Sequence, residues 1–540
     1  MHLKRALSLA ALAAIASLIL IAQNPPAKVP PPSLCSRNVN VLSLLPSLPG
    51  SPPNPNEDGD TQFLNALIDN TESALLRQVP TASSLGLAHE VELLGKLFIY
   101  DKSISPSENI GCATCHAPYA GFTGGTNIFN ATTVAQAGGT PILNAVPPEP
   151  NVRFGPRKPQ SYAYAPFSPI LHFNATQGDF YGGNFWDMRA TGIRLGNPAA
   201  EQAQGPPVNP VEIGNPDTAC VIWKVSQGGY RSLVELLYGK QSFAITWPSN
   251  VASVCATPGP PPTNDPFPVH LSAKDRGTSN STYDHLVLAV ASYESSSEVS
   301  AFSSKFDAFL AGNADLTASE LRGYELFNGK AHCNQCHVNG NEVNSPGLEP
   351  ADVAPLFTDF TSANIGVPKN LALPYYCETK PDQFGFTANP LGLKFTDLGV
   401  GAMLSGTNNP NPSQWRFLAP LFNGKFQVPT LRDVDMRPRA NFTKAYMHNG
   451  YLKSLGEVVH FYNTSQLLPT CAQGSPGEKV SCWPAPETPA NLTTLIGNLG
   501  LTEEEESDLV TFLQTLTDGF VTTPTTPALT LEKRRPTKKQ

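Results

Sequence analysis

The sequence has no excess of positive charge, and this excludes one large class of partner. Its 36 Lys and Arg residues are outnumbered by 44 Asp and Glu residues, which gives a formal net charge of −8 at pH 7. Proteins that bind nucleic acid usually present a strongly basic surface. We therefore expect no nucleic-acid partner, and we interpret the basic end at residues 521–540 as a solvated tail.

Long hydrophobic runs are also absent, apart from one near the N-terminus. Lys4 and Arg5 precede an apolar run from Ala6 to Ala22. This order of charge and apolar run is typical of an export signal. The run is short for a membrane span and no clean cleavage site follows it, so residues 1–23 are either a cleaved signal or an N-terminal anchor. Both alternatives place the protein in the periplasm or at the cell surface.

Histidine is scarce, with 10 residues in 540, so its placement is informative. Two of these histidines end the same short pattern, C-x-x-C-H. The two copies consist of Cys112, Cys115 and His116, and of Cys333, Cys336 and His337. This pattern attaches a c-type haem, because the thiols form thioethers with the porphyrin and the His binds the iron. A redox dithiol needs no following His, and a zinc site would need further ligands nearby. The sequence therefore predicts two covalently bound haem c groups.

Four of the 10 cysteines belong to these motifs, and the other six fit the disulfides of an oxidising compartment. Cys220 with Cys255, and Cys471 with Cys482, each lie within a Pro-rich insertion. Cys35 and Cys377 are a third candidate pair. Spacing alone does not fix these pairings.

Two capping boxes mark helix starts in the C-terminal half of the chain. Thr317-x-x-Glu320 and Thr502-x-x-Glu505 are capping boxes, and an apolar stripe that follows the second box is expected to end at Gly519. The 53 prolines predict long irregular connections. We predict a mainly α protein with two cytochrome-c-like helical domains, one covalent haem each, and long Pro-rich loops. The expected order is residues 1–23 as export signal or anchor, 24–83 as Pro-rich linker or wrap, 84–300 as N-terminal cytochrome c domain, 301–520 as C-terminal cytochrome c domain and 521–540 as basic tail.

Several segments beyond the haem motifs resemble the bacterial dihaem cytochrome c peroxidase family, which includes the MauG-type enzymes. These segments are Leu94–Phe98, Phe122–Gly125, Phe185–Arg189, Glu201–Pro206 with Glu212, Phe426–Arg432 and Tyr446–Gly450. The resemblance runs from about residue 84 to 520. It implies that the first haem reacts with peroxide and that the second haem transfers electrons.

The resemblance also implies roles for four side chains. Glu212 would move protons at the bound peroxide, with Gln202 as a hydrogen-bonding companion and Pro206 shaping the pocket. Trp186 would lie between the two haems and relay electrons. Without the resemblance, Glu212 would be interpreted as a surface residue and Trp186 as a core residue.

Two departures from the family pattern concern the haem ligands. No His lies between His116 and His172, where classical members carry a distal ligand, so the first haem is expected to have an open sixth position. Tyr462 stands fourteen residues after His448, where a Met ligand of the second haem is usual. Tyr at this position is a MauG-type feature, and a phenolate lowers the reduction potential. The alternatives for this ligand are His460, Met403, Met436 and Met447, and we expect His448 to contact the ligands rather than the iron.

A third departure concerns the calcium that bridges the two domains in the family. Lys158 replaces an Asn ligand, and Ala445 replaces a nearby Pro. These changes put calcium in doubt, and the Lys158 ammonium is a candidate substitute for the charge of the ion.

The sequence thus favours a haem peroxidase that reduces hydrogen peroxide with electrons from a small redox protein. The first alternative is MauG-like oxidation of side chains in a protein substrate. Dihaem oxygenase chemistry and plain electron transfer are further alternatives, and both the monomer and the homodimer remain open.

Overall fold

The computed structural model describes most of the chain between residues 59 and 521. The described residues are 59–80, 86–126, 130, 136–137, 153–261, 263, 265–339 and 354–521. The export signal or anchor, Cys35 and the basic tail beyond residue 521 lie outside them. Among the described helices, none is long and apolar enough to cross a membrane.

The described chain is mainly helical, as predicted, with only short strands. The helices are α3 (Gly59–Leu76), α4 (Leu87–Tyr100), α5 (Cys112–Cys115), α7 (Pro198–Gln204), α8 (Thr218–Gln227), α9 (Arg231–Tyr238), α10 (Val251–Cys255), α11 (Ala273–Glu294), α12 (Lys305–Leu310), α13 (Ala318–Asn328), α14 (Val400–Ser405), α15 (Pro412–Trp415), α16 (Ala419–Phe422), α17 (Leu455–Thr464) and α18 (Glu503–Gln514). The strands form three antiparallel pairs, β1 (Gln136–Ala137) with β2 (Arg153–Phe154), β3 (His172–Asn174) with β4 (Asp179–Tyr181), and β5 (Ser362–Ala363) with β6 (Phe426–Gln427).

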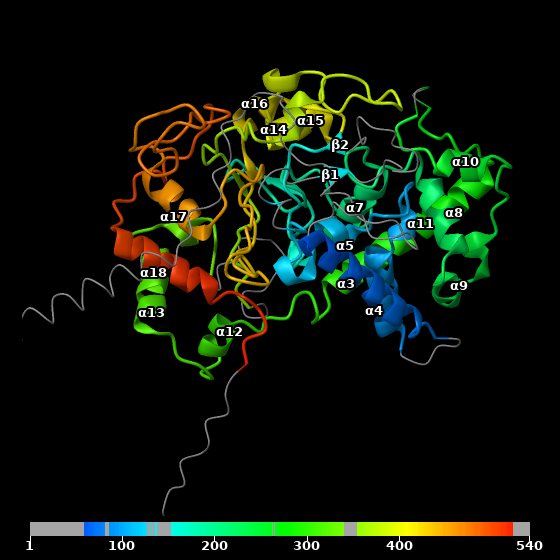
Figure 1. Cartoon of the computed structure of the whole chain (residues 1–540), viewed down its shortest axis with the longest axis horizontal. Helices are drawn as coiled ribbons and strands as arrows, with labels where there is room; N and C mark the ends of the chain where they lie inside the picture. The colour runs from blue at the N-terminus through cyan, green and yellow to red at the C-terminus, as the bar shows by residue number, and fades with distance from the viewer. Residues whose placement is uncertain are drawn as a thin grey trace, which may run out of the picture.

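Two separate groups of helices carry the main hydrophobic clusters (Figure 1). The first cluster includes buried residues of α3, α4, α8, α9 and α11, and the second includes residues of α12, α13, α17 and α18. In Figure 1 the first group lies on the right, the second on the left, and α14 to α16 at the top. Each group also carries one of the two haem motifs.

The helix before each haem motif crosses a later helix at a glycine. A Cβ atom on Gly95 of α4 would lie 2.0 Å from the Ala289 carbonyl oxygen of α11. A Cβ atom on Gly323 of α13 would lie 2.1 Å from the Asp508 carbonyl oxygen of α18. Only glycine permits this close backbone approach. The same helix crossing therefore occurs next to both haem motifs, and it explains the sequence similarity between the two segments.

The predicted helix starts are confirmed, and one predicted end is wrong. Capping boxes at Thr317 and Thr502 open α13 and α18. The apolar stripe of α18 is buried in the second cluster, as expected. The helix ends at Gln514 rather than reaching Gly519, because the chain turns away through a C-cap at Thr515.

The N-terminal linker is also shorter than predicted. Residues 24–83 were expected to form a Pro-rich linker, but Gly59–Leu76 forms α3. Leu64, Ile68 and Leu75 of this helix are buried in the first cluster. Burial of this apolar side outweighs the loop-forming composition of the preceding residues.

Two of the predicted disulfides are present. Cys220 is bonded to Cys255, and Cys471 is bonded to Cys482. Cys377 is disulfide-bonded as well, while its expected partner Cys35 lies outside the described residues. None of the four cysteines of the haem motifs forms a disulfide in the described structure.

Candidate functional site

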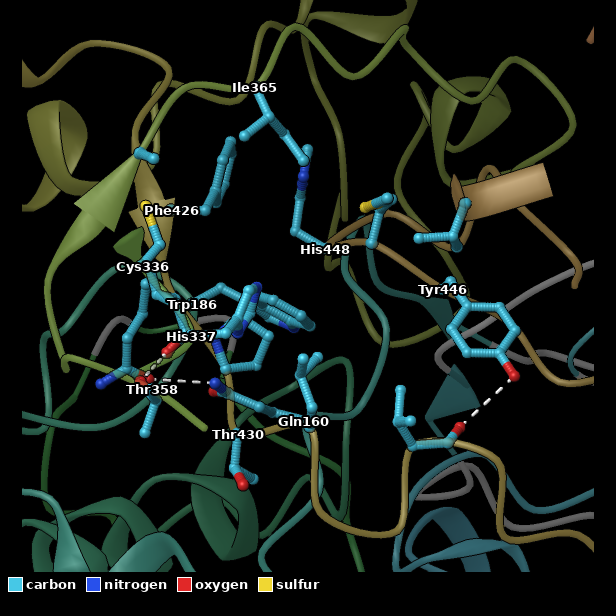
Figure 2. A pocket seen from close by; sticks show the side chains of 18 of the residues that line it. Gln160, Trp186, Cys336, His337, Thr358, Ile365, Phe426, Thr430, Tyr446 and His448 are labelled. Carbon is cyan, nitrogen blue, oxygen red and sulfur yellow. Dashed lines mark hydrogen bonds between the residues drawn. The ribbon is translucent and has the colours of Figure 1, made fainter. Parts of the chain in front are cut away.

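Each haem motif lines its own cavity. The first cavity has a volume of about 150 Å³ and is lined by Cys112, Cys115 and His116. The second has a volume of about 240 Å³ and is lined by Cys333, Cys336 and His337. Figure 2 shows Cys336 and His337 among the side chains around the second cavity.

The two motif histidines are held in the same way. The Nδ1 atom of His116 lies 2.9 Å from the Phe122 carbonyl oxygen, and Nδ1 of His337 lies 2.9 Å from the Phe357 carbonyl oxygen. Both phenylalanines have a positive φ, 56° and 54°. An Nδ1–H group that donates to this carbonyl leaves Nε2 available to bind iron.

The protonation state of these histidines fits the same role. Burial lowers the pKa of His116 to about 4 and also lowers the pKa of His337. Iron binds the neutral imidazole, so neither ring has to lose a proton at neutral pH. Together with the motif cysteines, this arrangement fits two c-type haems.

Two buried lysines, Lys158 and Lys444, lie beside the cavities, and Lys453 is partly buried. Lys158, Lys444 and Lys453 donate to neutral oxygen atoms, and within the described part of the chain none of them forms an ion pair. Lys158 lines both cavities and Lys444 lines the second. Burial lowers the pKa of Lys158, and Lys444 and Lys453 lower it further. An unpaired buried cation is costly, so this charge suits the anionic propionates of a haem.

The structure also shows the surroundings of Lys158, which stands where the family has a calcium ligand. The Lys158 ammonium donates to the Thr123 hydroxyl and to the Pro159 carbonyl oxygen, 3.1 Å away in the second case. Within the described ranges, no group of three or more His, Cys, Asp or Glu residues is arranged to hold a metal ion. Whether Lys158 stands in for the ion stays a prediction.

The residues predicted to act on peroxide lie together in the first cavity. Gln202 on α7, Pro206 and Glu212 all line it, beside His116. Asn197 opens α7 by accepting hydrogen bonds from two backbone amides, and Gln202 follows five residues later in this helix. Pro206 begins a short 3₁₀ turn that directs the chain back toward Glu212.

Glu212 is held ready to exchange protons. Its Oε1 atom accepts a hydrogen bond from Asn209 Nδ2 at 2.6 Å. Burial raises the pKa of Glu212, against the opposing effects of Arg189 and of the Asn209 hydrogen bond. A carboxyl group whose pKa is raised toward neutrality can both accept and return a proton.

The open side of the first cavity offers few alternative ligands. Among the described residues that line this cavity, His116 is the only His, and none is a Met. The undescribed stretch between residues 127 and 152 contains no His, Met or Cys in its sequence. These facts agree with the expected open coordination position.

Trp186 lies in the wall between the two cavities and lines both. Its indole Nε1–H donates to the Lys158 carbonyl oxygen at 2.8 Å, and its own carbonyl oxygen accepts from the Gln427 amide at 2.8 Å. Figure 2 shows Trp186 and His337 among the side chains that line the second cavity. That Trp186 relays electrons stays a prediction.

Tyr462 lines the second cavity with Cys336 and His337. It lies in the last turn of α17, which begins at the Ser454 cap. The cavity is also lined by His448, whose ring stacks on Phe426 with centroids 3.6 Å apart.

Most alternatives to Tyr462 are engaged elsewhere. The His460 ring bonds Glu506 Oε1 at 3.1 Å and the Val480 carbonyl oxygen at 3.1 Å. Met403 is buried in a separate hydrophobic cluster, and Met436 is not among the described residues that line the cavity. Met447 does line it, so Tyr462 and Met447 are the two candidates that the geometry retains.

Sequence reasoning missed further residues of the first cavity. Glu294, Arg189 and Tyr162 all line it, and one oxygen of the buried Glu294 carboxyl group has no hydrogen-bond partner within the described chain. Burial raises the pKa of Glu294 well above its usual value. The sequence did carry a signal for Glu294. Leu286, Val290 and Glu294 follow each other at four-residue spacing and thus share one helix face.

Comparison with known proteins gives the family. A family model described as di-haem cytochrome c peroxidase matches residues 89–315. The methylamine utilization protein MauG of Paracoccus denitrificans is 29% identical over 428 residues, which cover 79% of this chain and 88% of that protein. These matches support the MauG-type dihaem cytochrome c peroxidase family for this chain.

Other relatives of this dihaem peroxidase agree with the assignment. The cytochrome-c peroxidase IdrP1 of Denitromonas iodatirespirans is 32% identical over 233 residues, which cover 42% of this chain and 48% of that protein. The crystal structure of the diheme peroxidase BthA of Burkholderia thailandensis has 25% identity and a TM-score of 0.54, and the match covers 79% of this chain and 86% of that one. The family resemblance drawn from the sequence is confirmed, and the chain is a haem peroxidase. The roles of individual residues stay predictions.

Proposed function

We propose that this dihaem peroxidase reduces hydrogen peroxide at the first cavity. Electrons would reach that cavity through the second haem from a small redox protein. The supporting observation is that Glu212, Gln202 and Pro206 line the same cavity as the first haem motif. Reduction of one peroxide consumes two electrons and two protons and gives two water molecules.

The side chains of the first cavity would manage the protons of this reaction. When bound, the two haems supply one iron that can bind peroxide and a second that stores and passes electrons. Glu212 would take a proton from the peroxide and return it to the departing oxygen. Asn209 holds the Glu212 carboxylate in place, and the Gln202 amide donates a hydrogen bond to the peroxide. Pro206 narrows the cavity.

Electrons would cross between the two cavities through Trp186. Its indole N–H donates to the Lys158 carbonyl oxygen, and its backbone carbonyl oxygen accepts from the Gln427 amide. A fixed aromatic ring in this wall needs no rearrangement to pass an electron. Trp186 would thus connect the site of peroxide reduction with the site where electrons arrive.

Mixing the oxidised holoprotein with hydrogen peroxide and a reduced small cytochrome tests this proposal. We expect the cytochrome to be oxidised from the first turnover, with no prior reduction of the enzyme, because the described lining of the cavity includes no second His or Met to be released. The proposal is wrong if turnover begins only after the protein has been reduced.

MauG-like oxidation of a protein substrate is the second candidate, and Tyr462 favours it. A phenolate ligand lowers the reduction potential and stabilises oxidised iron, whereas a Met thioether does the reverse. An oxidising equivalent held at the second haem would then be available to side chains of a docked protein. The reduction potential of the second haem separates the two candidates, because the MauG-like function requires a low value.

We also propose that the protein works outside the cytoplasm. The export-like N-terminal sequence supports this location. The disulfides Cys220–Cys255 and Cys471–Cys482 support it independently, because such bonds persist in oxidising compartments.

A further inference from the structure

Three buried tyrosines connect the first cavity with the protein surface. Tyr162 lines the cavity, and its ring centroid lies 5.4 Å from that of the His116 ring. Tyr100 is the last residue of α4, and Tyr293 lies at the end of α11. The three side chains are only 5%, 3% and 2% exposed. The two helices cross at Gly95 and Ala289, five and four residues before Tyr100 and Tyr293.

The three hydroxyl groups differ in their partners. The Tyr162 hydroxyl has no hydrogen-bond partner within the described chain. All three tyrosines are buried in the first hydrophobic cluster. Burial raises the pKa of Tyr162, and the charge of Tyr100 raises it further.

The chain of tyrosines ends at an exposed carboxylate. The Tyr293 hydroxyl donates to Glu298 Oε1 at 3.0 Å, and the Glu298 side chain is 52% exposed. Lys96 Nζ lies 2.6 Å from the same oxygen and 5.7 Å from the centroid of the Tyr293 ring. The Tyr293 phenol is therefore separated from solvent by the Glu298 side chain, which forms an ion pair with Lys96.

We propose that Tyr162, Tyr100 and Tyr293 form a second route for oxidising equivalents, which leads from the first cavity to the surface at Glu298. This inference rests on the proposed reaction with peroxide, which supplies the oxidant. Tyr293 loses one electron and its hydroxyl proton. The electron passes through Tyr100 and Tyr162 to the peroxide-oxidised haem centre, and the proton moves to Glu298 Oε1. A soluble one-electron reductant at the surface then restores the Tyr293 phenol, with the proton returned by Glu298.

Hydrogen bonding identifies Tyr293 as the residue on which the oxidising equivalent rests. Oxidation of a phenol requires an acceptor for its proton, and Tyr293 alone among the three donates to a carboxylate. Phenylalanine would fill the same space without the cost of burying a hydroxyl group. Tyr162, whose hydroxyl has no partner within the described chain to take its proton, would carry only the electron.

Rapid freezing of the holoprotein after addition of hydrogen peroxide, followed by EPR spectroscopy, tests the route. Protein that contains ring-deuterated tyrosine identifies a tyrosyl radical by its narrowed hyperfine pattern. We expect this radical in the wild-type protein, its loss in Tyr293→Phe and a strong reduction in Glu298→Gln. Tyr238→Phe is the matched control, because the Tyr238 ring stacks on His285 and does not line either cavity in the described structure.

The outcomes separate this inference from the proposed function. Peroxide consumed without a tyrosyl radical, or with a radical unchanged in Tyr293→Phe, overturns the tyrosine route alone. Peroxide that is not consumed overturns both the route and the proposed function. Glu298→Gln changes only an exposed side chain, so it keeps the test valid if Tyr293→Phe fails to fold. Ascorbate should shorten the life of the wild-type radical, and an unaffected lifetime would contradict the surface end of the route.

Discussion

Replacement of Glu212 by glutamine removes the proposed proton carrier and little else. Glutamine has the same shape and keeps an oxygen that can accept the 2.6 Å hydrogen bond from Asn209. The first haem motif and Gln202 are unchanged by this substitution. Any loss of rate is therefore attributable to the ability of the side chain to accept and return a proton.

The size of the expected loss follows from general acid–base catalysis. A positioned proton carrier typically contributes about 100- to 10,000-fold to the rate. Because the haem iron and Gln202 remain, we expect the lower part of this range, a fall of about 100- to 1,000-fold in the second-order rate constant for peroxide. This loss corresponds to about 3–4 kcal/mol of transition-state stabilisation.

The pH dependence provides a second readout of Glu212. Burial raises its pKa, and the reaction needs the carboxylate to accept the first proton. In the wild-type protein the rate constant should therefore fall as the pH drops through this raised pKa. In Glu212→Gln that acidic limb should disappear, because glutamine does not titrate.

Stopped-flow measurement of the reaction with peroxide checks both effects. Glu235→Gln is a suitable control, because the Glu235 carboxylate pairs with Arg231 on α9 and does not line either cavity in the described structure. Haem content is measured in every variant. A rate constant in Glu212→Gln equal to that of the wild-type protein, with full haem content, would refute the assigned role.

The remaining predictions concern the second haem and the helix crossing beside it. Tyr462→Met should raise the reduction potential of the second haem, as measured by spectroelectrochemical titration, and an unchanged potential would favour Met447 as the ligand. Gly323→Ala should lower stability by about 1–3 kcal/mol, because the new Cβ atom would lie 2.1 Å from the Asp508 carbonyl oxygen and the two helices must separate. Gly277→Ala on α11 meets no atom within 4 Å and should instead stabilise the protein by about 0.5–1 kcal/mol. Thermal unfolding of the two variants compares them, and equal shifts would contradict the packing argument.

The features predicted correctly from the sequence depend mainly on neighbouring residues. The capping boxes at Thr317 and Thr502 each involve residues three positions apart, and the Cys471–Cys482 bond closes a loop of modest length. The haem motifs are equally local. A motif or helix cap that is formed by neighbouring residues can be recognised directly in the sequence.

Features that depend on distant contacts were harder to predict. α3 was hidden because its apolar residues follow a long Pro-rich stretch and are buried only by packing on α4. His460 could be set aside as a haem ligand only because its ring contacts Glu506, which lies on another helix. Glu294 and Tyr162 come to the first cavity from segments more than a hundred residues apart, and neither belongs to a motif.

The central claim is that the first haem has an open coordination position while the second has both axial ligands. The EPR spectrum of the fully oxidised, as-isolated holoprotein tests this claim most directly. The account predicts one high-spin ferric signal from the first site and one low-spin ferric signal from the second. Two low-spin signals would contradict it, because they would mean that an unrecognised side chain closes the first site.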